Sequence, residues 1–206
     1  MQIVNIITQY YPSFFKALGI TLQMTVISLL CATVLGVIFG LFKVSDFKVL
    51  KLIADVYIDI IRGTPLLVQV MIMMYGVGSV LKPYGFHLSN IVCAFTAGCV
   101  ALSLNAGAYM AEIIRGGIEA VDKGQMEAAR SLGLSYGKAM RKLILPQAFR
   151  TMLPSIINQF IISLKDTSLV SVIGPRELTQ NGKIIAANSA SMVMPIWICV
   201  ALFYLV

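Results

Sequence analysis

The chain has 206 residues, of which 58% are hydrophobic and only 12% are charged, and its mean hydropathy is +0.87. Soluble domains carry about 25% charged residues, so this composition excludes an ordinary soluble domain and indicates an all-α integral membrane protein. The net charge of +7 does not require a nucleic-acid partner, because membrane proteins concentrate lysine and arginine in their cytoplasmic loops.

Five stretches are apolar enough and long enough to cross a membrane, which takes about 20 helical residues. We expect a single membrane domain over residues 1–206, with spans at about 17–42, 54–80, 90–114, 151–173 and 187–206. The segments that connect them are 43–53, 81–89, 115–150 and 174–186. Only the segment 115–150 is long enough to form a substructure of its own.

Lysine and arginine are distributed unevenly between the two sides of this five-span arrangement. Segments 43–53 and 115–150 lie on one side and carry ten cations, whereas the opposite side carries four. Because cations favour the cytoplasmic side of a membrane, we expect the N-terminus outside and the C-terminus inside.

The first span carries small and hydroxyl residues at intervals of three or four, which places them on one face of a helix. Within this face, Gly36 and Gly40 form a small-xxx-small pattern that is typical of close helix contacts. The pattern predicts either close packing against a neighbouring helix or the lining of a polar path. The residues of the face are Thr21, Thr25, Ser28, Ala32, Gly36 and Gly40.

The second span contains an ion pair and a helix break. Asp59 and Arg62 are three residues apart and are expected to pair on one helix face. The sequence Gly63-Thr64-Pro65 interrupts the helix, because proline lacks the N–H group and disfavours helix in the residue before it. Irregular backbone at membrane depth requires protein or a water-filled cavity around it, so the break marks either a transport site or a simple kink.

The third span ends with a polar stripe. Asn105, Tyr109 and Glu112 are four and three residues apart, so they lie on one face toward the cytoplasmic end. Glu112 can instead form an interfacial pair with Arg115, and the sequence leaves both readings open.

The segment after the third span predicts two short helices with a defined turn. Glu127 to Leu132 can form the first helix, Gly133 suits the left-handed residue that ends it, and Ser135 suits the N-cap of the second. We expect the second helix to end at Leu145, where Pro146 breaks the pattern. Its basic face allows a helix resting on anionic headgroups, but the order of helix, glycine stop and helix favours a docking site for another protein.

The fourth span contains Lys165 and Asp166 well inside the apolar stretch. Each charge costs about 2.5–3.5 kcal/mol on insertion scales, and neighbours in a helix point about 100° apart, so the two cannot neutralise each other face to face. We expect a partner on another span, on a second subunit or on a solute. With Thr167 and Ser168 beside them, a carboxylate, an ammonium and hydroxyls at one level suit a zwitterionic solute.

Catalytic and cofactor motifs are absent from the sequence. The stretch "GLSYGKA" is one residue short of a phosphate-binding loop and has alanine in place of the following Ser or Thr. His87 has no carboxylate or cysteine near it in the sequence. We therefore expect no catalytic residue, no metal and no bound cofactor on this chain.

The segment 127–146 resembles the EAA motif of the permease subunits of ABC importers. Glu127-Ala128-Ala129 is followed after three residues by Gly133, and after nine more by Leu143-x-Leu145-Pro146, with leucine where the family prefers isoleucine at residue 143. The stretches "YIDIIRGTPLLVQ", "NAGAYMAEIIRGGI", "LPQAFR" and "LKDTSLVSVIG" resemble the histidine/glutamine/arginine-type branch, the polar amino acid permeases. This similarity extends over about residues 10–200.

The resemblance implies the five-span fold of type I importer permeases in a bacterial cytoplasmic membrane, with a coupling helix on the cytoplasmic side. It implies a permease dimer, for which we favour a homodimer over a heterodimer. It further implies two cytoplasmic ATPase subunits that hold ATP and Mg, and an extracytoplasmic binding protein that delivers an amino acid; membrane lipid surrounds the chain and no nucleic acid is involved. The residues expected to contact the ATPase are Glu127, Ala128, Ala129, Arg130, Leu132 and Gly133.

The polar intramembrane residues become candidates for the substrate path. They are Lys165, Asp166, Thr167, Ser168, Asn105, Tyr109, Glu112, Arg62 and Thr64. A different reading is a self-sufficient ion- or proton-coupled carrier built on Lys165 and Asp166, which predicts transport without ATP. Basic amino acids, glutamine and cystine are all compatible as substrates.

Overall fold

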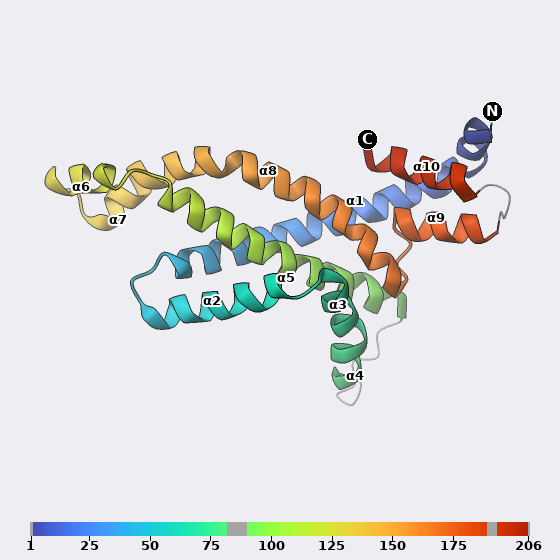
Figure 1. Ribbon diagram of the computed structural model, residues 1–206, viewed down its shortest axis with the longest axis horizontal. Coiled ribbons are helices and arrows are strands. Elements are labelled where there is room, and N and C mark those ends of the chain that lie inside the picture. The colour runs from blue at the N-terminus through green and yellow to red at the C-terminus, as the bar shows by residue number, and fades with distance from the viewer. Residues whose placement is uncertain (1, 82–89, 189–192, 206) are drawn as a thin grey trace. The chain divides into compact units, whose positions relative to one another are not determined.

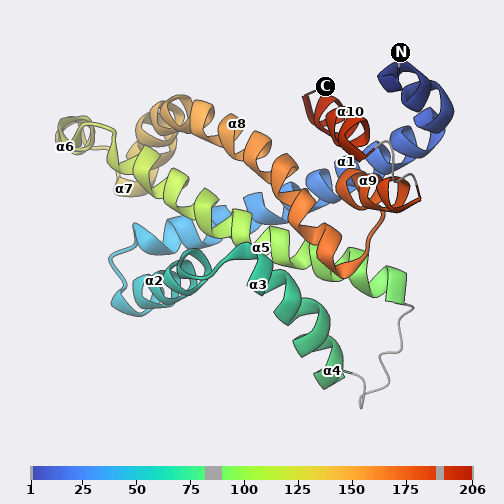
Figure 2. The ribbon, with the colours of Figure 1, turned by 45° about the vertical axis from the view of Figure 1, so that its right-hand side comes forward.

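The computed structural model describes residues 2–81, 90–188 and 193–205, and all regular secondary structure in these ranges is helical (Figures 1 and 2). Two π-helical turns join α3 to α4 (Ile72–Val77) and α7 to α8 (Met140–Ile144), and a 3-10 turn follows α8 (Ser171–Ile173). The predicted all-α class is therefore confirmed. The α-helices are α1 (Gln2–Lys43), α2 (Lys48–Gly63), α3 (Leu66–Met71), α4 (Gly78–Leu81), α5 (Asn90–Glu119), α6 (Lys123–Ser131), α7 (Tyr136–Ala139), α8 (Leu145–Val170), α9 (Leu178–Ala187) and α10 (Val193–Leu205).

Three continuous helical stretches are long and apolar enough to cross a membrane. They cover Thr8–Lys43, Ala94–Glu119 and Tyr136–Ile173. A fourth candidate is the broken pair Lys48–Gly63 and Leu66–Val77, and α10 is apolar but shorter. Each predicted span overlaps one of these stretches, while the number of five spans stays a prediction.

Several predicted boundaries are wrong. Most of the connector 43–53 belongs to α2, which begins at Lys48. Lys48 and Lys51 lie in the first turn of this helix, and a prediction based on apolar residues does not include charged ones. The connector 174–186 contains most of α9, which is amphipathic rather than apolar. Residue 187, the predicted start of the last span, is the last residue of α9, and the described part of the apolar helix α10 is Val193–Leu205. Most of the connector 81–89 lies outside the described residues.

Contacts group the chain into two compact units. Unit 1 comprises Met1–Leu29, Pro65–Ser103 and Ile162–Val206, and unit 2 comprises Leu30–Thr64 and Leu104–Ile161. Helices α1, α5 and α8 each contribute one part to unit 1 and the other part to unit 2. The prediction of a single domain remains untested by this grouping.

Unit 1 has two apolar clusters. In the first, Phe14 of α1 packs with Leu178 of α9 and with Ile196 of α10. Helices α9 and α10 lie side by side (Figures 1 and 2). The second cluster joins α1, α3, α5 and α8 through residues such as Met24 and Val170.

The small-residue face of α1 packs closely, as one of the two readings predicted. In unit 1, Thr21, Thr25 and Ser28 are buried, and the Ser28 hydroxyl donates to the Cys99 carbonyl of α5 at 3.3 Å. In unit 2, a Cβ atom on Gly36 would lie 2.6 Å from Met110 Cβ. One on Gly40 would lie 3.0 Å from Ile114 Cβ, so the two glycines allow α1 and α5 to approach each other.

The turn after α6 confirms the predicted glycine stop. Gly133 has φ +82°, Leu134 N donates to Ala129 O at 3.1 Å, and Gly133 N donates to Arg130 O at 3.0 Å. These two bonds form a Schellman motif, which satisfies the last carbonyls of a helix. The helix begins earlier than predicted, because the Asp122 carboxylate accepts from Gly124 N at 2.6 Å and caps α6 at its N-terminus.

The predicted helix end at Leu145 is wrong. Ser135 does precede α7, although its side chain makes no capping bond. The helix then continues through the π-helical turn Met140–Ile144 into α8. Pro146 has no N–H for an α-helical bond to the preceding turn, and the wider π turn, whose bonds span five residues, keeps the helix continuous there.

Candidate functional site

Glu112 lies at the centre of a cluster of charged residues in unit 2. Its carboxylate accepts from Lys43 Nζ of α1 at 2.5 Å and from Arg115 Nη2 of α5 at 2.8 Å, and Arg62 Nη1 of α2 lies 3.9 Å away. Only 17% of the Glu112 side chain is exposed. The Glu112 cluster therefore ties three helices of this unit together through one carboxylate.

Two further carboxylates complete the Glu112 cluster. Asp55 of α2 lies 3.2 Å from Lys43 Nζ, and Glu119 accepts from Arg115. As defined here, the cluster contains three cations and three anions. Its members are Lys43, Asp55, Arg62, Glu112, Arg115 and Glu119.

Close backbone packing brings the members of the cluster within reach. Besides the approach of α1 and α5 at Gly36 and Gly40, a Cβ on Gly107 would lie 3.0 Å from both Leu35 Cβ and the Tyr57 hydroxyl. The Tyr57 hydroxyl donates to Leu104 O at 2.7 Å. Small residues on α1 and α5 thus set the spacing that allows short bonds between the charged ends.

Arg62 does not pair with Asp59, so that prediction is wrong. The ion pairs found within the described ranges connect Arg62 to Glu112, and the guanidinium carbon lies 5.1 Å from the centre of the Tyr109 ring. Such a stacked cation and ring attract each other. Asp59 itself is exposed on α2.

The predicted helix break at Gly63-Thr64-Pro65 is confirmed. Helix α2 ends at Gly63, and α3 begins at Leu66. The Thr64 hydroxyl donates to Ile60 O at 2.9 Å, so it satisfies one of the carbonyls that the end of α2 leaves open. This contact and the Arg62–Tyr109 stack hold the C-terminal end of α2 within unit 2.

The polar stripe of α5 is present but differs in exposure along its length. Asn105 is buried, Tyr109 is partly exposed beside Arg62, and Glu112 lies within the cluster. Of the residues predicted for the substrate path, the fold therefore brings Arg62, Tyr109 and Glu112 together.

Lys165, Asp166, Thr167 and Ser168 belong to unit 1. Thr167 is fully buried and donates to Leu164 O at 2.6 Å, whereas Lys165 is exposed and Asp166 half-buried. The ion pairs among the described residues include neither Lys165 nor Asp166. The intrachain salt bridge that the sequence allowed is thus not formed within the part of the chain that the structure describes.

Sequence reasoning missed Glu177, a buried residue at the start of α9. Its carboxylate accepts from Thr179 N at 2.8 Å, from Gln180 N at 2.6 Å and from the Tyr204 hydroxyl of α10 at 2.9 Å. Burial raises the pKa of this carboxyl above its ordinary value, although these bonds act in the opposite direction. The available signal was an acidic residue two positions after Pro175, directly before a helical run.

The predicted ATPase-contacting residues form the surface of α6 and the turn after it. Glu127, Ala128 and Arg130 are exposed, and so are Leu132 and Gly133. Leu132 is 85% exposed, so the turn presents an apolar side chain at its surface. Ala129 alone is buried and anchors the segment from inside.

This architecture is that of a membrane subunit of a transport system. Residues 32–206 match the family model described as "Binding-protein-dependent transport system inner membrane component", and the chain belongs to this family. It is therefore a multi-pass permease of the inner membrane, in a family whose systems use a separate ATPase and a binding protein.

Two curated relatives show how far the similarity extends. The arginine transport system permease protein ArtQ of Bacillus subtilis is 40% identical over 94% of this chain and 85% of its own length. The glutamine transport system permease protein GlnP of Escherichia coli K12 is 41% identical over 95% of this chain and 86% of its own length.

Solved structures give the same architecture. A crystal structure of an amino acid ABC transporter with histidines matches with a TM-score of 0.85 and 42% identity, over 97% of this chain and 89% of that one. The MetNI methionine ABC transporter matches with a TM-score of 0.72 at 19% identity, which supports the fold alone. These matches confirm the predicted type I importer permease fold and give no support to the ion-coupled carrier.

Proposed function

We propose that this chain is the permease subunit of an ATP-driven importer of polar amino acids. The observation that carries the proposal is the match, at 42% identity over 97% of the chain, to an amino acid ABC transporter. The names of the two curated relatives, which refer to arginine and glutamine, support the same substrate class. The substrates to be tested first are thus arginine, histidine and glutamine.

Uptake into liposomes tests this function directly. The permease, reconstituted with its partner ATPase and supplied with the binding protein, should accumulate one of these amino acids only when ATP is present on the ATPase side. Accumulation driven by a proton or sodium gradient without ATP would contradict the proposal and revive the carrier reading. Ligand screening of the binding protein identifies which amino acid to use.

The exposed residues of α6 and its turn form the proposed contact with the ATPase. Five of the six predicted residues are exposed, and Ala129 and the Schellman motif hold the segment in one conformation. Helix α7 continues into α8 through the π turn, so Tyr136–Ile173 is one continuous helical stretch. A displacement of α7 by the ATPase would therefore move the membrane-spanning part of α8 with it. Two ATPase subunits, each with ATP and Mg, fit a dimer of permeases.

A charge reversal at Glu127 tests the docking proposal. Glu127→Lys changes an exposed helical residue and should abolish copurification with the ATPase and uptake, while the permease still folds. Asp46→Lys is the matched control, because Asp46 is exposed and lies between α1 and α2. Gly133→Trp should have the same effect as Glu127→Lys. Normal ATPase association in both Glu127→Lys and Gly133→Trp would overturn the assignment.

Two groups of polar residues are proposed to act in transport. One is Lys165 to Ser168 in unit 1, and the other is Arg62, Thr64, Asn105 and Tyr109 in unit 2. Since the Glu112 carboxylate is occupied by cations of its own chain, we assign Glu112 the role of holding helices of unit 2 together rather than contacting the solute.

The membrane orientation and the assembly state complete the proposal. The bias of ten cations against four supports an N-terminus outside and a C-terminus inside. A homodimer of this chain is the assembly that we favour over a heterodimer. Mass measurement of the purified complex decides between one permease species and two.

A further inference from the structure

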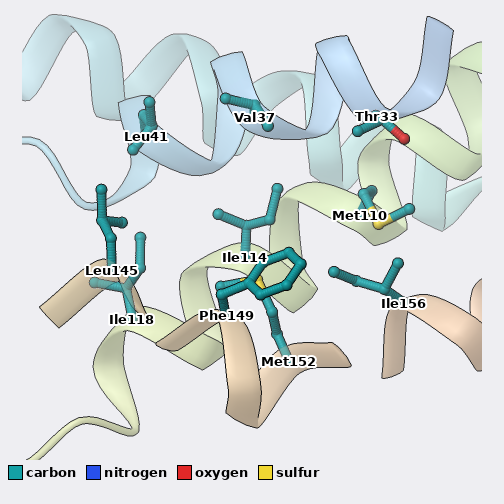
Figure 3. A pocket seen from close by; sticks show the side chains of 10 residues that line it. All are labelled: Thr33, Val37, Leu41, Met110, Ile114, Ile118, Leu145, Phe149, Met152 and Ile156. Atoms are coloured by element: carbon teal, nitrogen blue, oxygen red, sulfur yellow. The ribbon is translucent and has the colours of Figure 1, made fainter. Parts of the chain in front are cut away.

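Cavities in the two units differ in the side chains that line them. A cavity in unit 2 is lined by apolar side chains of α1, α5 and α8 and by a single hydroxyl-bearing residue, Thr33 (Figure 3). A smaller cavity in unit 1, of about 170 Å³, is lined by apolar side chains together with Thr21 and Tyr204. The Tyr204 hydroxyl belongs to a group of polar contacts that connects α9 and α10 with α8.

The Tyr204 hydroxyl lies between a buried carboxylate and a buried threonine. It donates to Glu177 Oε2 at 2.9 Å, and Thr179 Oγ1 lies 3.1 Å from it. It also interacts with the side chain of Thr167 in α8. Glu177 and Thr167 are both fully buried, so solvent reaches neither of these two partners. Tyr204 therefore connects the start of α9 with the part of α8 that contains residues 165–168.

The backbone of α9 holds the Glu177 carboxylate in one orientation. Glu177 caps this helix, and its two oxygens accept from Thr179 N at 2.8 Å and from Gln180 N at 2.6 Å. Hydrogen bonds to a carboxylate are shorter and stronger than those between neutral groups. The capped carboxylate therefore fixes the direction of the Tyr204 hydroxyl, which donates to the same oxygen as Thr179 N.

A short turn joins α8 to α9 and keeps the two helices close. The 3-10 turn Ser171–Ile173 is followed by Gly174 at φ +99°, a left-handed conformation that glycine adopts without steric cost. Lys183 Nζ of α9 donates to Ser171 Oγ at 2.8 Å. This bond and the turn hold α9 beside the end of α8, where the Tyr204 hydroxyl reaches both helices.

Thr167 controls the directions in which its neighbours point. Successive residues of a helix point about 100° apart, so a fixed Thr167 side chain also sets the directions of Lys165 and Asp166. Thr167 is held from one side by its own helix, through the bond to Leu164 O at 2.6 Å, and from the other by Tyr204. Lys165 is exposed and forms no ion pair among the described residues, so its direction depends on the helix that carries it.

We propose that Glu177 and Tyr204 are positioning residues for residues 165–168: they fix the rotation of this part of α8 and thereby the direction in which Lys165 and Asp166 meet the amino acid. Neither Glu177 nor Tyr204 contacts the solute. Without the Tyr204 hydroxyl, Thr167 is held from one side only, and the charged side chains next to it bind the solute less well. This role depends on the transport function proposed above for the same residues.

ATP-driven uptake into liposomes by the complete permease–ATPase complex tests this role. Tyr204→Phe removes the hydroxyl and keeps the ring. The varied substrate is the binding protein, loaded with the amino acid that the unaltered complex accumulates. We expect its half-saturating concentration to rise about fivefold, which corresponds to one hydrogen bond of about 1 kcal/mol, while the maximal rate stays normal. A merely structural role would instead lower the maximal rate and leave half-saturation unchanged, and that result would overturn the proposal.

Tyr10→Phe is the matched control in the same unit. Tyr10 of α1 and Tyr204 pack against the same apolar cluster, whose members include no residue of α8. The control should therefore keep its half-saturating concentration within twofold of the unaltered complex. An equal rise in Tyr10→Phe and Tyr204→Phe would show a general effect of losing a tyrosine hydroxyl and would contradict the positioning role.

Thr167→Val decides whether Tyr204 acts through Thr167. This substitution should raise the half-saturating concentration by itself, and adding Tyr204→Phe to it should cause no further rise, because interacting residues are not additive. A further fivefold rise would mean that the two act independently, and the proposal would fail. If Tyr204→Phe does not copurify with the ATPase, Glu177→Gln takes its place in this cycle, with the same non-additivity expected.

Lys165→Met separates a failure of the positioning role from a failure of the transport function. If Lys165→Met leaves uptake normal, residues 165–168 do not act in transport, and both assignments are wrong. If Lys165→Met abolishes uptake while Tyr204→Phe leaves half-saturation unchanged, only the positioning role is wrong. Loss of uptake in the first and a raised half-saturating concentration in the second is the result that we expect.

Discussion

The Glu112 cluster in unit 2 and the Lys165–Asp166 pair in unit 1 place charges in membrane-spanning helices in opposite ways. In the cluster, three carboxylates meet three cations of the same chain, and the central carboxylate is largely buried. Lys165 is exposed, and neither it nor Asp166 takes part in an ion pair among the described residues. Charges in lipid are costly until they find a partner. From this contrast we expect the buried centre of the cluster around Glu112 to serve the fold, and Lys165 and Asp166 to interact with a partner or solute outside this chain.

Lys165→Met should give the largest effect. Since Lys165 is exposed, its removal takes little from the fold, but loss of a charged partner for the solute should lower uptake by roughly 100-fold or more. Uptake into liposomes and copurification with the ATPase measure the two effects separately. Lys16→Met, which removes an exposed cation from α1, should leave both unchanged. If Lys165→Met prevents assembly, the lysine forms a salt bridge between subunits instead.

Glu112→Gln should act on stability rather than on transport. Lys43 and Arg115 would keep their charges and lose their shared carboxylate, which should lower the free energy of unfolding by about 2–3 kcal/mol. Thermal unfolding in detergent measures this change, and uptake per folded molecule should stay normal. Glu119→Gln removes a carboxylate that is 55% exposed and should cost no more than about 0.5 kcal/mol. A fully stable Glu112→Gln protein without uptake would place Glu112 in the substrate path.

Arg62→Lys tests the edge of the cluster, where stacking rather than ion pairing dominates. Lysine keeps the charge near Glu112 but loses the planar group over the Tyr109 ring, so we expect a loss of about 0.5–1 kcal/mol. A double-mutant cycle with Tyr109→Leu should return a coupling energy of the same size. A coupling energy near zero would show that the 5.1 Å approach contributes nothing measurable.

Asp55→Asn should give the smallest effect. Asp55 lies 3.2 Å from Lys43 and its side chain is 36% exposed, so solvent screens the pair and its loss should cost about 0.5 kcal/mol. The difference from the unaltered protein should disappear in 1 M salt, where the screening length is about 3 Å. A difference that persists at high salt would mean that the Asp55–Lys43 pair is shielded from solvent in the way that Glu112 is.

Sequence patterns predicted the features that depend on neighbouring residues. The left-handed Gly133, the break before Pro65 and the close face of Gly36 and Gly40 each follow from what one or two residues can do with their backbone. The same reasoning failed at Pro146, because a π turn is a less common way to accommodate proline than a helix end. Asp122 is a residue type that suits an N-cap, so the earlier start of α6 lies within the same local rules.

Contacts between distant segments could not be predicted in the same way. Arg62 had a suitable partner three residues away in Asp59, yet it interacts with Tyr109 and Glu112 of another helix. Glu177 and Tyr204 are 27 residues apart, and nothing in either neighbourhood indicates the other. The fold could still be predicted, because the EAA motif and the other matching stretches indicate a known family. That resemblance extends across the chain and implies contacts that local rules cannot predict.

The Glu112 cluster also constrains how the protein is made. Lys43 and Asp55 leave the ribosome first and can pair as soon as α1 and α2 have entered the membrane. Arg62 and Lys43 must then wait for α5, because Glu112 is synthesised fifty residues after Arg62. Early in biogenesis the nascent chain thus holds an excess of positive charge at this end of its helices. Insertion of α5 brings Glu112, which neutralises that excess and completes the ion pairs of the cluster.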